Sequence, residues 1–483
     1  MFIDGRLTAG RAREEIQVIN PATEEVIGSA PRGTPIDALA AVDAAKRAFP
    51  AWSRTPAPLR AAALHEAASK IRQHQDELVR LLTMEEGKPI PENEEELYWT
   101  GDTFDYYAEL ARHERGRVLP PGDPGQFNFV LKEPYGVAGL IVPWNYPLLL
   151  LAWKLAPALA AGNTVVIKPS ELTPLTTLRM VEVAMDHIPP GVINVVTGFG
   201  PETGEPLVTH PDVEVIAFTG SLQVGQRIAS LAGPMMKKLH LELGGKDPLV
   251  IGPDVDLDVA VRALAYAALL NAGQVCTSTE RVYVAQNPHS QFSEELADFV
   301  SRLRLGNGLE AGTDIGPMIR NRFREKVENQ LSEAVSEGGR VLVGGRRPAA
   351  LDKGYFLEPA VIINVDHSMS LMQEETFGPV IPLMPYDDFD EAIALANDTP
   401  YGLGASLMTN DPKLVKKFYE NVRAGTIWIN DPLTDNFAGP FGGMKMSGLG
   451  RELGQEGLDE FLEVKHVHWD IEGGIKDYWY PYG

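Results

Sequence analysis

The stretch VAGLIVPWNYPLLLLAWKLAPALAAGNTVVIKPS, residues 137–170, decides the fold of this chain. Two short runs rich in β-branched residues enclose an apolar segment, residues 146–162, which is too short for a membrane span and carries Lys154. We interpret this segment as a buried helix between two strands. A strand, a helix and a second strand in this order predict a parallel pair joined by a crossover helix.

The same alternation continues along the chain. Further strand-like runs occupy residues 191–198, 213–220 and 238–245, with helical stretches between them, and a second alternation begins at residue 247. Before it, residues 36–115 show apolar positions at helical spacing. The pattern predicts an α/β protein with a Rossmann-type, doubly wound sheet. Because 52.7 kDa exceeds what one hydrophobic core supports, we expect two large domains.

The composition excludes several classes of function. With 44% hydrophobic and 23% charged residues the chain is ordinary for a globular protein, and its formal charge of -23 disfavours nucleic acid as a partner. The single cysteine cannot form an internal disulfide, and the amino-terminal residues lack the apolar core of a signal peptide. We therefore expect a cytoplasmic protein that does not associate with membranes.

Two glycine-rich loops follow predicted strands. In GFGPETG, residues 198–204, the spacing of the glycines differs by one residue from the usual dinucleotide-binding motif. In FTGSLQVG, residues 218–225, Gly225 is not followed by the lysine and the serine or threonine that a nucleoside triphosphate-binding loop requires. Either loop alone is equally consistent with a simple turn. Two such loops at one edge of a parallel sheet, however, favour a dinucleotide whose pyrophosphate lies at a helix amino terminus.

The charged pair Lys168 and Glu171 ends a third predicted strand. A solvated surface pair is the ordinary interpretation, but an acidic residue beyond a strand also binds adenosine ribose hydroxyls and repels a 2′-phosphate. On the second interpretation NAD is favoured and NADP remains a less favoured alternative. The histidines have no metal-ligand spacing, so we predict no metal.

The only cysteine, Cys276, lies in NAGQVCTSTER, residues 271–281, a polar stretch after an apolar helix. A buried, inert thiol is the alternative, but this position suits a loop that presents the sulfur. Glu242 ends another predicted strand beside two glycines, where a carboxylate can reach over a cofactor crevice. A thiolate and a carboxylate base are the groups that acyl chemistry through a thioester requires.

With these motifs in order, the chain resembles the NAD(P)-dependent aldehyde dehydrogenase superfamily over nearly its whole length. PWNYP, KPSE, LELGGK, GQVCTS, EETFGP and PFGGMKMSG carry the resemblance, and Cys276 lies 34 positions after Glu242, as in hydrolytic members. The resemblance implies that Cys276 attacks the aldehyde, that Asn145 stabilises the oxyanion and that Glu242 activates water. Lys154 and Glu452 match residues thought to relay protons.

The resemblance also assigns the cofactor site, because the family's own glycine loop has the spacing of residues 198–204. The residues matched to cofactor contacts are Ile141, Pro143, Trp144, Lys168, Ser170, Glu171, Gly200, Gly204, Phe218, Gly220, Ser221, Val224, Leu243, Gly244, Glu375 and Phe377.

Six residues match the family's substrate tunnel: Tyr146, Leu149, Trp153, Val275, Thr277 and Phe441. In betaine and amino aldehyde dehydrogenases, aromatic residues at the matching positions help to hold a cationic group, and Glu96, Asp431 and Asp435 lie near acidic or entrance positions. Enzymes of aliphatic and aromatic aldehydes share several of these residues. The sequence therefore suggests an enzyme that oxidises a small nitrogen-bearing aldehyde to the carboxylic acid. A coenzyme A-acylating enzyme and a catalytically idle homologue are the alternatives.

The resemblance further implies a division of the chain. We expect an NAD-binding domain at 1–116 and 136–244, a catalytic domain at 245–445, and an oligomerisation element with a carboxyl-terminal tail at 117–135 and 460–483. The tail carries Tyr478, Trp479, Tyr480 and Tyr482, and so dense a set of aromatic residues favours docking onto a neighbouring subunit of a homodimer or homotetramer.

Overall fold

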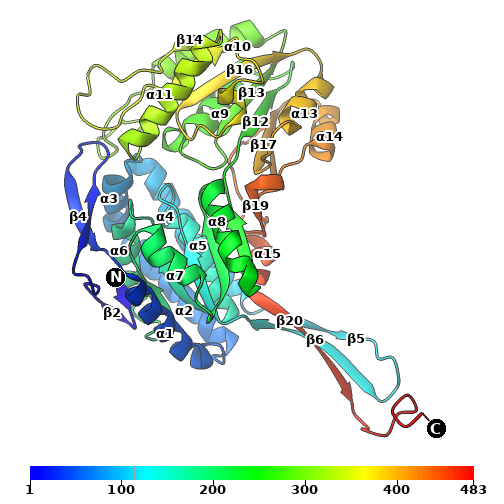
Figure 1. Cartoon of the computed structure of the whole chain (residues 1–483). Helices are drawn as coiled ribbons and strands as arrows, with labels where there is room; N and C mark the ends of the chain where they lie inside the picture. Colours follow the sequence, from blue (N-terminus) through cyan, green and yellow to red (C-terminus); the bar gives the residue numbers. More distant parts are fainter. Residues whose placement is uncertain (114, 483) are drawn as a thin grey trace.

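A computed structural model describes residues 1–113 and 115–482 (Figure 1). One sheet has the strand order β19-β11-β10-β7-β8-β9-β1-β2, in which β7 to β11 run parallel to one another and β1, β2 and β19 add antiparallel edges. Its strands are β1 (Phe2–Ile3), β2 (Arg6–Leu7), β7 (Val137–Ile141), β8 (Thr164–Lys168), β9 (Ile193–Val195), β10 (Val213–Thr219), β11 (Lys238–Glu242) and β19 (Gly448–Leu449).

Residues 149–161 form the predicted crossover helix, α5 (Leu149–Ala161), and nearly all of its side chains are buried. Gly162 ends it in a left-handed conformation that glycine adopts without strain. The other helices of this part are α1 (Pro35–Trp52), α2 (Ala57–Gln73), α3 (Gln75–Glu86), α4 (Ile90–Leu110), α6 (Pro174–Ala184), α7 (Glu205–Val208), α8 (Leu222–Ala232) and α15 (Gly454–Asp459). The prediction of a doubly wound α/β fold is confirmed.

A further sheet has the order β14-β15-β16-β13-β12-β17-β18 and is parallel apart from β14. Its strands are β12 (Asp247–Ile251), β13 (Thr279–Ala285), β14 (Arg340–Val343), β15 (Ala360–Ile363), β16 (Val380–Tyr386), β17 (Gly404–Met408) and β18 (Thr426–Ile429). Its helices are α9 (Leu257–Leu269), α10 (His289–Ser301), α11 (Asn321–Ser336), α12 (Ser370–Gln373), α13 (Phe389–Asn397) and α14 (Pro412–Asn421).

A three-stranded antiparallel arm, β5 (Gly116–Leu119), β6 (Gln126–Pro134) and β20 (Leu462–Asp470), projects from the body, and the chain ends near its tip (Figure 1). β6 and β20 pair along their full length, from Leu462 opposite Pro134 to Asp470 opposite Gln126. Residues 116–134 therefore form a hairpin whose second strand also pairs with β20.

Some elements do not follow from the sequence pattern. The hairpin β3 (Glu15–Ile19) and β4 (Val26–Pro31) and the edge strands β1, β2 and β19 are too short or too irregular to show a clear alternation. Within residues 1–113 and 115–482, every helix is too short or too polar to cross a bilayer.

Candidate active site

The strand order creates a crevice at the carboxyl edge of the first sheet. The chain passes from β7 to β8 on one side, and later returns to place β10 on the other side of β7. In open α/β sheets such a reversal separates the loops that follow two neighbouring strands and leaves a ligand crevice between them. Pro143 and Trp144 follow β7, Gly220 and Ser221 follow β10, and all of them line this crevice.

Half of the predicted cofactor residues line the crevice: Pro143, Trp144, Gly220, Ser221, Leu243, Gly244, Glu375 and Phe377. Sequence reasoning missed other lining residues, namely Thr219, Leu222, Gln223, Phe323, Lys326, Glu374 and Tyr401. Phe323 and Lys326 come from α11, whose amphipathic pattern carries no sign that one of its turns faces a ligand.

The remaining predicted cofactor residues lie outside the crevice lining, on neighbouring segments: Ile141, Lys168, Ser170, Glu171, Gly200, Gly204, Phe218 and Val224. Ile141 is in register with both Lys168 and Phe218, so these three mark adjacent strand ends. Burial lowers the pKa of Lys168, and the charge of Glu171 opposes this shift.

The helix expected after residues 198–204 is present but short. Gly200 to Gly204 form one wide helical turn, and α7 after it has only four residues. Gly204 packs against the Lys168 side chain, because a β-carbon on this glycine would lie 3.4 Å from Lys168 Cδ. The long helix whose amino terminus faces the crevice is α8.

The crevice fits a dinucleotide on two structural grounds. No side chain of the described residues caps α8, so the amides at its first turn stay available to a pyrophosphate, and Ser221, Leu222 and Gln223 of this turn line the crevice. A β-carbon on Gly244 would approach Glu375 Oε1 to 2.5 Å, so glycine is required for Glu375 to lie against this wall. Burial, followed by the charge of Glu280, raises the pKa of Glu375 to about 7.

Cys276 lies where the crevice meets a second pocket, since it lines both. Just before it, Asn271, Ala272 and Gly273 all have left-handed backbone conformations, which turn the chain sharply after α9. Asn145 lies in the same crevice, and its Nδ2 donates to the carbonyl of Gln274 at 2.9 Å. The predicted nucleophile and the predicted oxyanion donor thus share one wall.

Burial, and then the nearby carboxylates of Asp247 and Glu242, raise the pKa of the Cys276 thiol well above its usual range. This raised pKa keeps the thiol protonated at neutral pH. A base must therefore accept its proton before it attacks a carbonyl.

Glu242, Lys154 and Glu452 form a buried cluster beside the crevice rather than in its lining. Lys154 Nζ donates to Glu452 Oε1 at 2.5 Å and to Thr219 Oγ1 at 2.6 Å, and Thr219 lines the crevice. Both carboxylate oxygens of Glu242 are buried without a hydrogen-bond partner among the described residues. Burial and the charge of Glu452 raise the pKa of Glu242 well above its usual range.

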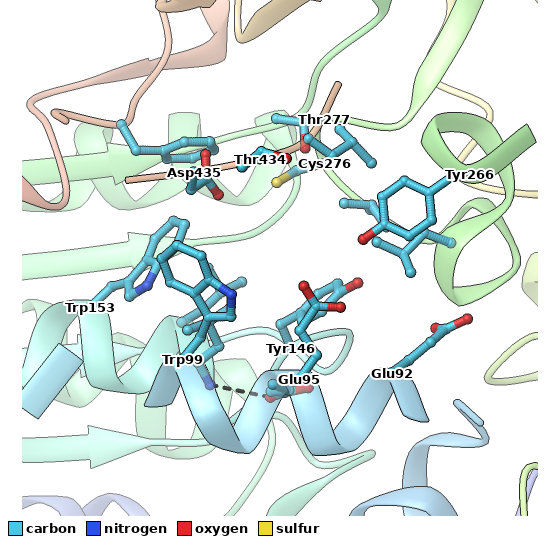
Figure 2. Close-up of a pocket in the computed structure, with 17 residues that line it drawn as sticks. Glu92, Glu95, Trp99, Tyr146, Trp153, Tyr266, Cys276, Thr277, Thr434 and Asp435 are labelled. Carbon is cyan, nitrogen blue, oxygen red and sulfur yellow. Dashed lines mark hydrogen bonds between the residues drawn. The ribbon is translucent and has the colours of Figure 1, made fainter. Parts of the chain in front are cut away.

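The second pocket contains all six predicted tunnel residues, Tyr146, Leu149, Trp153, Val275, Thr277 and Phe441. Figure 2 shows the Cys276 sulfur directed into this pocket, with Trp99 and Trp153 on one side and Tyr266 on the other. Trp153 packs against Phe441 with ring centroids 5.0 Å apart. Sequence reasoning missed Glu92, Glu95, Trp99, Leu150, Tyr266, Leu270, Leu433 and Thr434.

The structure differs from two expectations about how this pocket holds a cationic group, one for Tyr146 and one for Glu96. Lys88 Nζ lies 3.5 Å from the Tyr146 ring centroid, so the chain's own cation occupies one face of this ring. Glu96 pairs with Lys88 Nζ at 2.5 Å and accepts the backbone amides of Leu148 and Leu149, which stabilises the first turn of α5. Glu96 is therefore not a free anion for a substrate, although it does line the pocket.

Other carboxylates take its place at the pocket wall. Glu92, Glu95 and Asp435 line it, whereas Asp431 of the same entrance loop does not. Burial raises the pKa of both Glu92 and Asp435 to about 7; at Glu92 the charge of Lys88 opposes that effect. These two groups change charge within the neutral range.

A thiol that lines both a crevice suited to a dinucleotide and a second, largely aromatic pocket is an arrangement that suits an oxidoreductase. The sequence profile of the aldehyde dehydrogenase family matches residues 8–467, and this chain belongs to that family. It is thus an aldehyde dehydrogenase (NAD(P)+), as the resemblance predicted.

Three known proteins illustrate the range of its relatives. Aminoaldehyde dehydrogenase 1, peroxisomal, of Malus domestica is 42% identical over 478 residues, with 97% of this chain and 95% of the relative covered. The crystal structure of betaine aldehyde dehydrogenase from Staphylococcus aureus in complex with NAD+ superposes with a TM-score of 0.97 at 38% identity, covering 99% of this chain and 96% of that one. An E. coli NADP dependent enzyme superposes with a TM-score of 0.95 at 37% identity, covering 97% of each chain.

Proposed function

We propose that this enzyme oxidises an amino or betaine-type aldehyde to the carboxylic acid, with NAD as cofactor, through a thioester on Cys276. The observation that carries the proposal is the position of Cys276, which lines both the tunnel and the cofactor crevice. The test is a screen of NADH formation with aliphatic, aromatic, amino and trimethylammonio aldehydes, with the product identified. Formation of a coenzyme A thioester instead of the free acid would favour the acylating alternative.

The residues divide the chemistry between them. The Cys276 thiolate adds to the aldehyde carbon, and the carbonyl oxygen becomes an oxyanion. Asn145 stabilises it, because one of the two protons on its Nδ2 is donated to the carbonyl of Gln274 and the other has no acceptor among residues 1–113 and 115–482. When bound, the nicotinamide accepts the hydride that leaves this carbon. The C=O bond re-forms as a thioester.

Glu242 completes the cycle. Its carboxylate is buried beside the crevice, and we propose that it rotates toward Cys276 and accepts a proton from water. The hydroxide adds to the thioester carbon, the C–S bond breaks, and the acid leaves with the thiolate restored. The contacts of Lys154 with Thr219 and Glu452 support a path by which the proton leaves.

For the cofactor, the position of Glu171 beyond the end of β8 supports a preference for NAD. Replacing Glu171 with glutamine removes the negative charge that repels a 2′-phosphate. The difference in binding free energy between NAD and NADP should therefore shrink by about 1–3 kcal/mol. Dissociation constants of NAD and NADP, measured by quenching of tryptophan fluorescence, would report the change. An unchanged ratio of the two constants would place the selectivity at another residue.

For the substrate, Glu92, Glu95 and Asp435 beside Trp99, Trp153 and Tyr266 support a cationic aldehyde. Carboxylate charge and aromatic faces both attract an ammonium group.

This attraction should depend on pH. A carboxyl group with a pKa of about 7 is neutral below that pH and ionised above it, so Glu92 and Asp435 gain their charge as the pH rises from 6 to 8. The Michaelis constant of an amino aldehyde should fall over this range relative to an alkyl aldehyde of equal length. Asp435→Asn should make this fall in the Michaelis constant smaller. If the Michaelis constants of the two aldehydes depend on pH in the same way, the result would contradict a cationic substrate.

We also propose a cytoplasmic homodimer or homotetramer with the domain division given above. A reducing compartment suits an enzyme that depends on a free thiol. The arm formed by β5, β6 and β20 exposes Val118, Phe127, Leu131, Val464 and Trp469, and the exposed aromatic tail follows it. An apolar face of this kind supports contact with another subunit.

A further inference from the structure

The turn that carries Glu375 and Phe377 is held by a carboxylate that the mechanism above does not use. Glu280, on β13, is 3% exposed and lies four residues after Cys276. Its Oε2 accepts the backbone N–H of Thr376 at 2.7 Å, and its Oε1 accepts that of Phe377 at 2.7 Å. Lys246 Nζ donates to the same Oε2 at 2.7 Å. Every oxygen of this buried carboxylate is therefore engaged.

The amide that Glu280 holds belongs to a strained residue. Phe377 has φ +55°, in the left-handed region that bulky side chains rarely adopt. Such a conformation persists only where the surroundings over-determine it, and residues of this kind gather at ligand-binding positions. The bond from the Phe377 N–H to Glu280 is one such constraint.

The strained turn forms part of the cofactor crevice. Phe377 and Glu375 both line it, and the Phe377 ring meets Trp144 edge-on with centroids 5.6 Å apart. Glu375 Oε1 accepts the Gly245 N–H at 3.2 Å.

The same group of contacts reaches the segment after β11. Lys246 follows Gly244 and Gly245, and its Nζ donates to Thr376 Oγ1 at 2.9 Å as well as to Glu280. Three segments of the crevice thus meet at one carboxylate: the strand that follows Cys276, the 375–377 turn and the glycine pair after Leu243.

We propose that Glu280 is a positioning residue that sets the 375–377 turn relative to Cys276, so that the hydride-accepting end of the cofactor is held against the reacting carbon. This inference rests on the proposed function, because it takes Cys276 as the nucleophile. Glu280 lines neither pocket, so in this role it acts through Phe377 and Glu375.

Glu280→Gln tests the inference, because an amide side chain has one acceptor oxygen in place of two and presents N–H groups to other donors. The variant should bind NAD at least about five-fold more weakly, and the primary deuterium isotope effect on kcat, measured with an aldehyde deuterated at C1, should increase as hydride transfer becomes limiting. The rate at which iodoacetamide alkylates Cys276 without NAD should stay within about two-fold of the wild type. Asp37→Asn is the matched control, since buried Asp37 also accepts backbone amides, from Arg11 at 3.1 Å and Thr34 at 2.9 Å, but lines neither pocket.

Glu280→Gln leaves the Lys246 ammonium group without its counter-charge. If this single variant does not fold, the same measurements are made on the double variant Lys246→Met, Glu280→Gln. A folded variant with wild-type NAD affinity and isotope effect would overturn the inference. So would equal losses of NAD affinity and alkylation rate together with a fall in Tm that Asp37→Asn reproduces. Turnover by Cys276→Ser would instead refute the proposed function, and the NAD affinity of the Glu280 variants would still report on the turn.

Discussion

Replacing Cys276 with serine should abolish aldehyde oxidation while NAD still binds. A serine hydroxyl has a far higher pKa than a thiol, and the carboxylates of Asp247 and Glu242 nearby disfavour any further anion at this position. The expected loss in kcat is on the order of 10⁴-fold or more, as for the removal of other catalytic nucleophiles. The side chain hardly changes in size, so the crevice should keep its shape.

Stopped-flow measurement of NADH formation and fluorescence titration with NAD separate these two effects. Thr277→Ser, at the neighbouring tunnel residue, controls for a small change in the same loop and should keep most of the activity. Substantial turnover by the Cys276 variant, with the protein free of wild-type contamination, would remove the thiol from the mechanism.

Replacing Glu242 with glutamine should stop the cycle after hydride transfer. The variant keeps Cys276 and Asn145, so it should release one NADH per active site in a rapid burst and then slow by about 10²–10⁴-fold, the usual contribution of a general base. In the wild type, the raised pKa of Glu242 means that its carboxylate is ionised only at higher pH. Deacylation should therefore slow as the pH falls through that pKa.

Rapid quenching followed by mass spectrometry should detect the acyl group on Cys276 of the glutamine variant. Glu85→Gln is a suitable control, because Glu85 is also a buried carboxyl with a raised pKa, about 7, but lies in neither pocket. A glutamine variant that hydrolyses its thioester at the wild-type rate would assign the base to another residue.

The sequence by itself determined the class of the protein. Regular alternation of strand and helix from residue 137 onward predicted the doubly wound sheet, because side-chain periodicity follows directly from backbone geometry. The family resemblance carried by the ordered motifs then predicted the roles of Cys276, Glu242 and the tunnel residues around Trp153. Each of these signals is contained in a few consecutive residues.

Only the tertiary structure decided which of these groups meet. Lys88 lies under Tyr146, Glu280 holds the amide of Phe377, and Lys154 pairs with Glu452 almost 300 residues later in the chain. No local pattern marks such partners, since burial and contact arise from packing between distant segments. The same packing also raises the pKa values of Cys276 and Glu242, because desolvation and charge depend on the whole surrounding shell of residues.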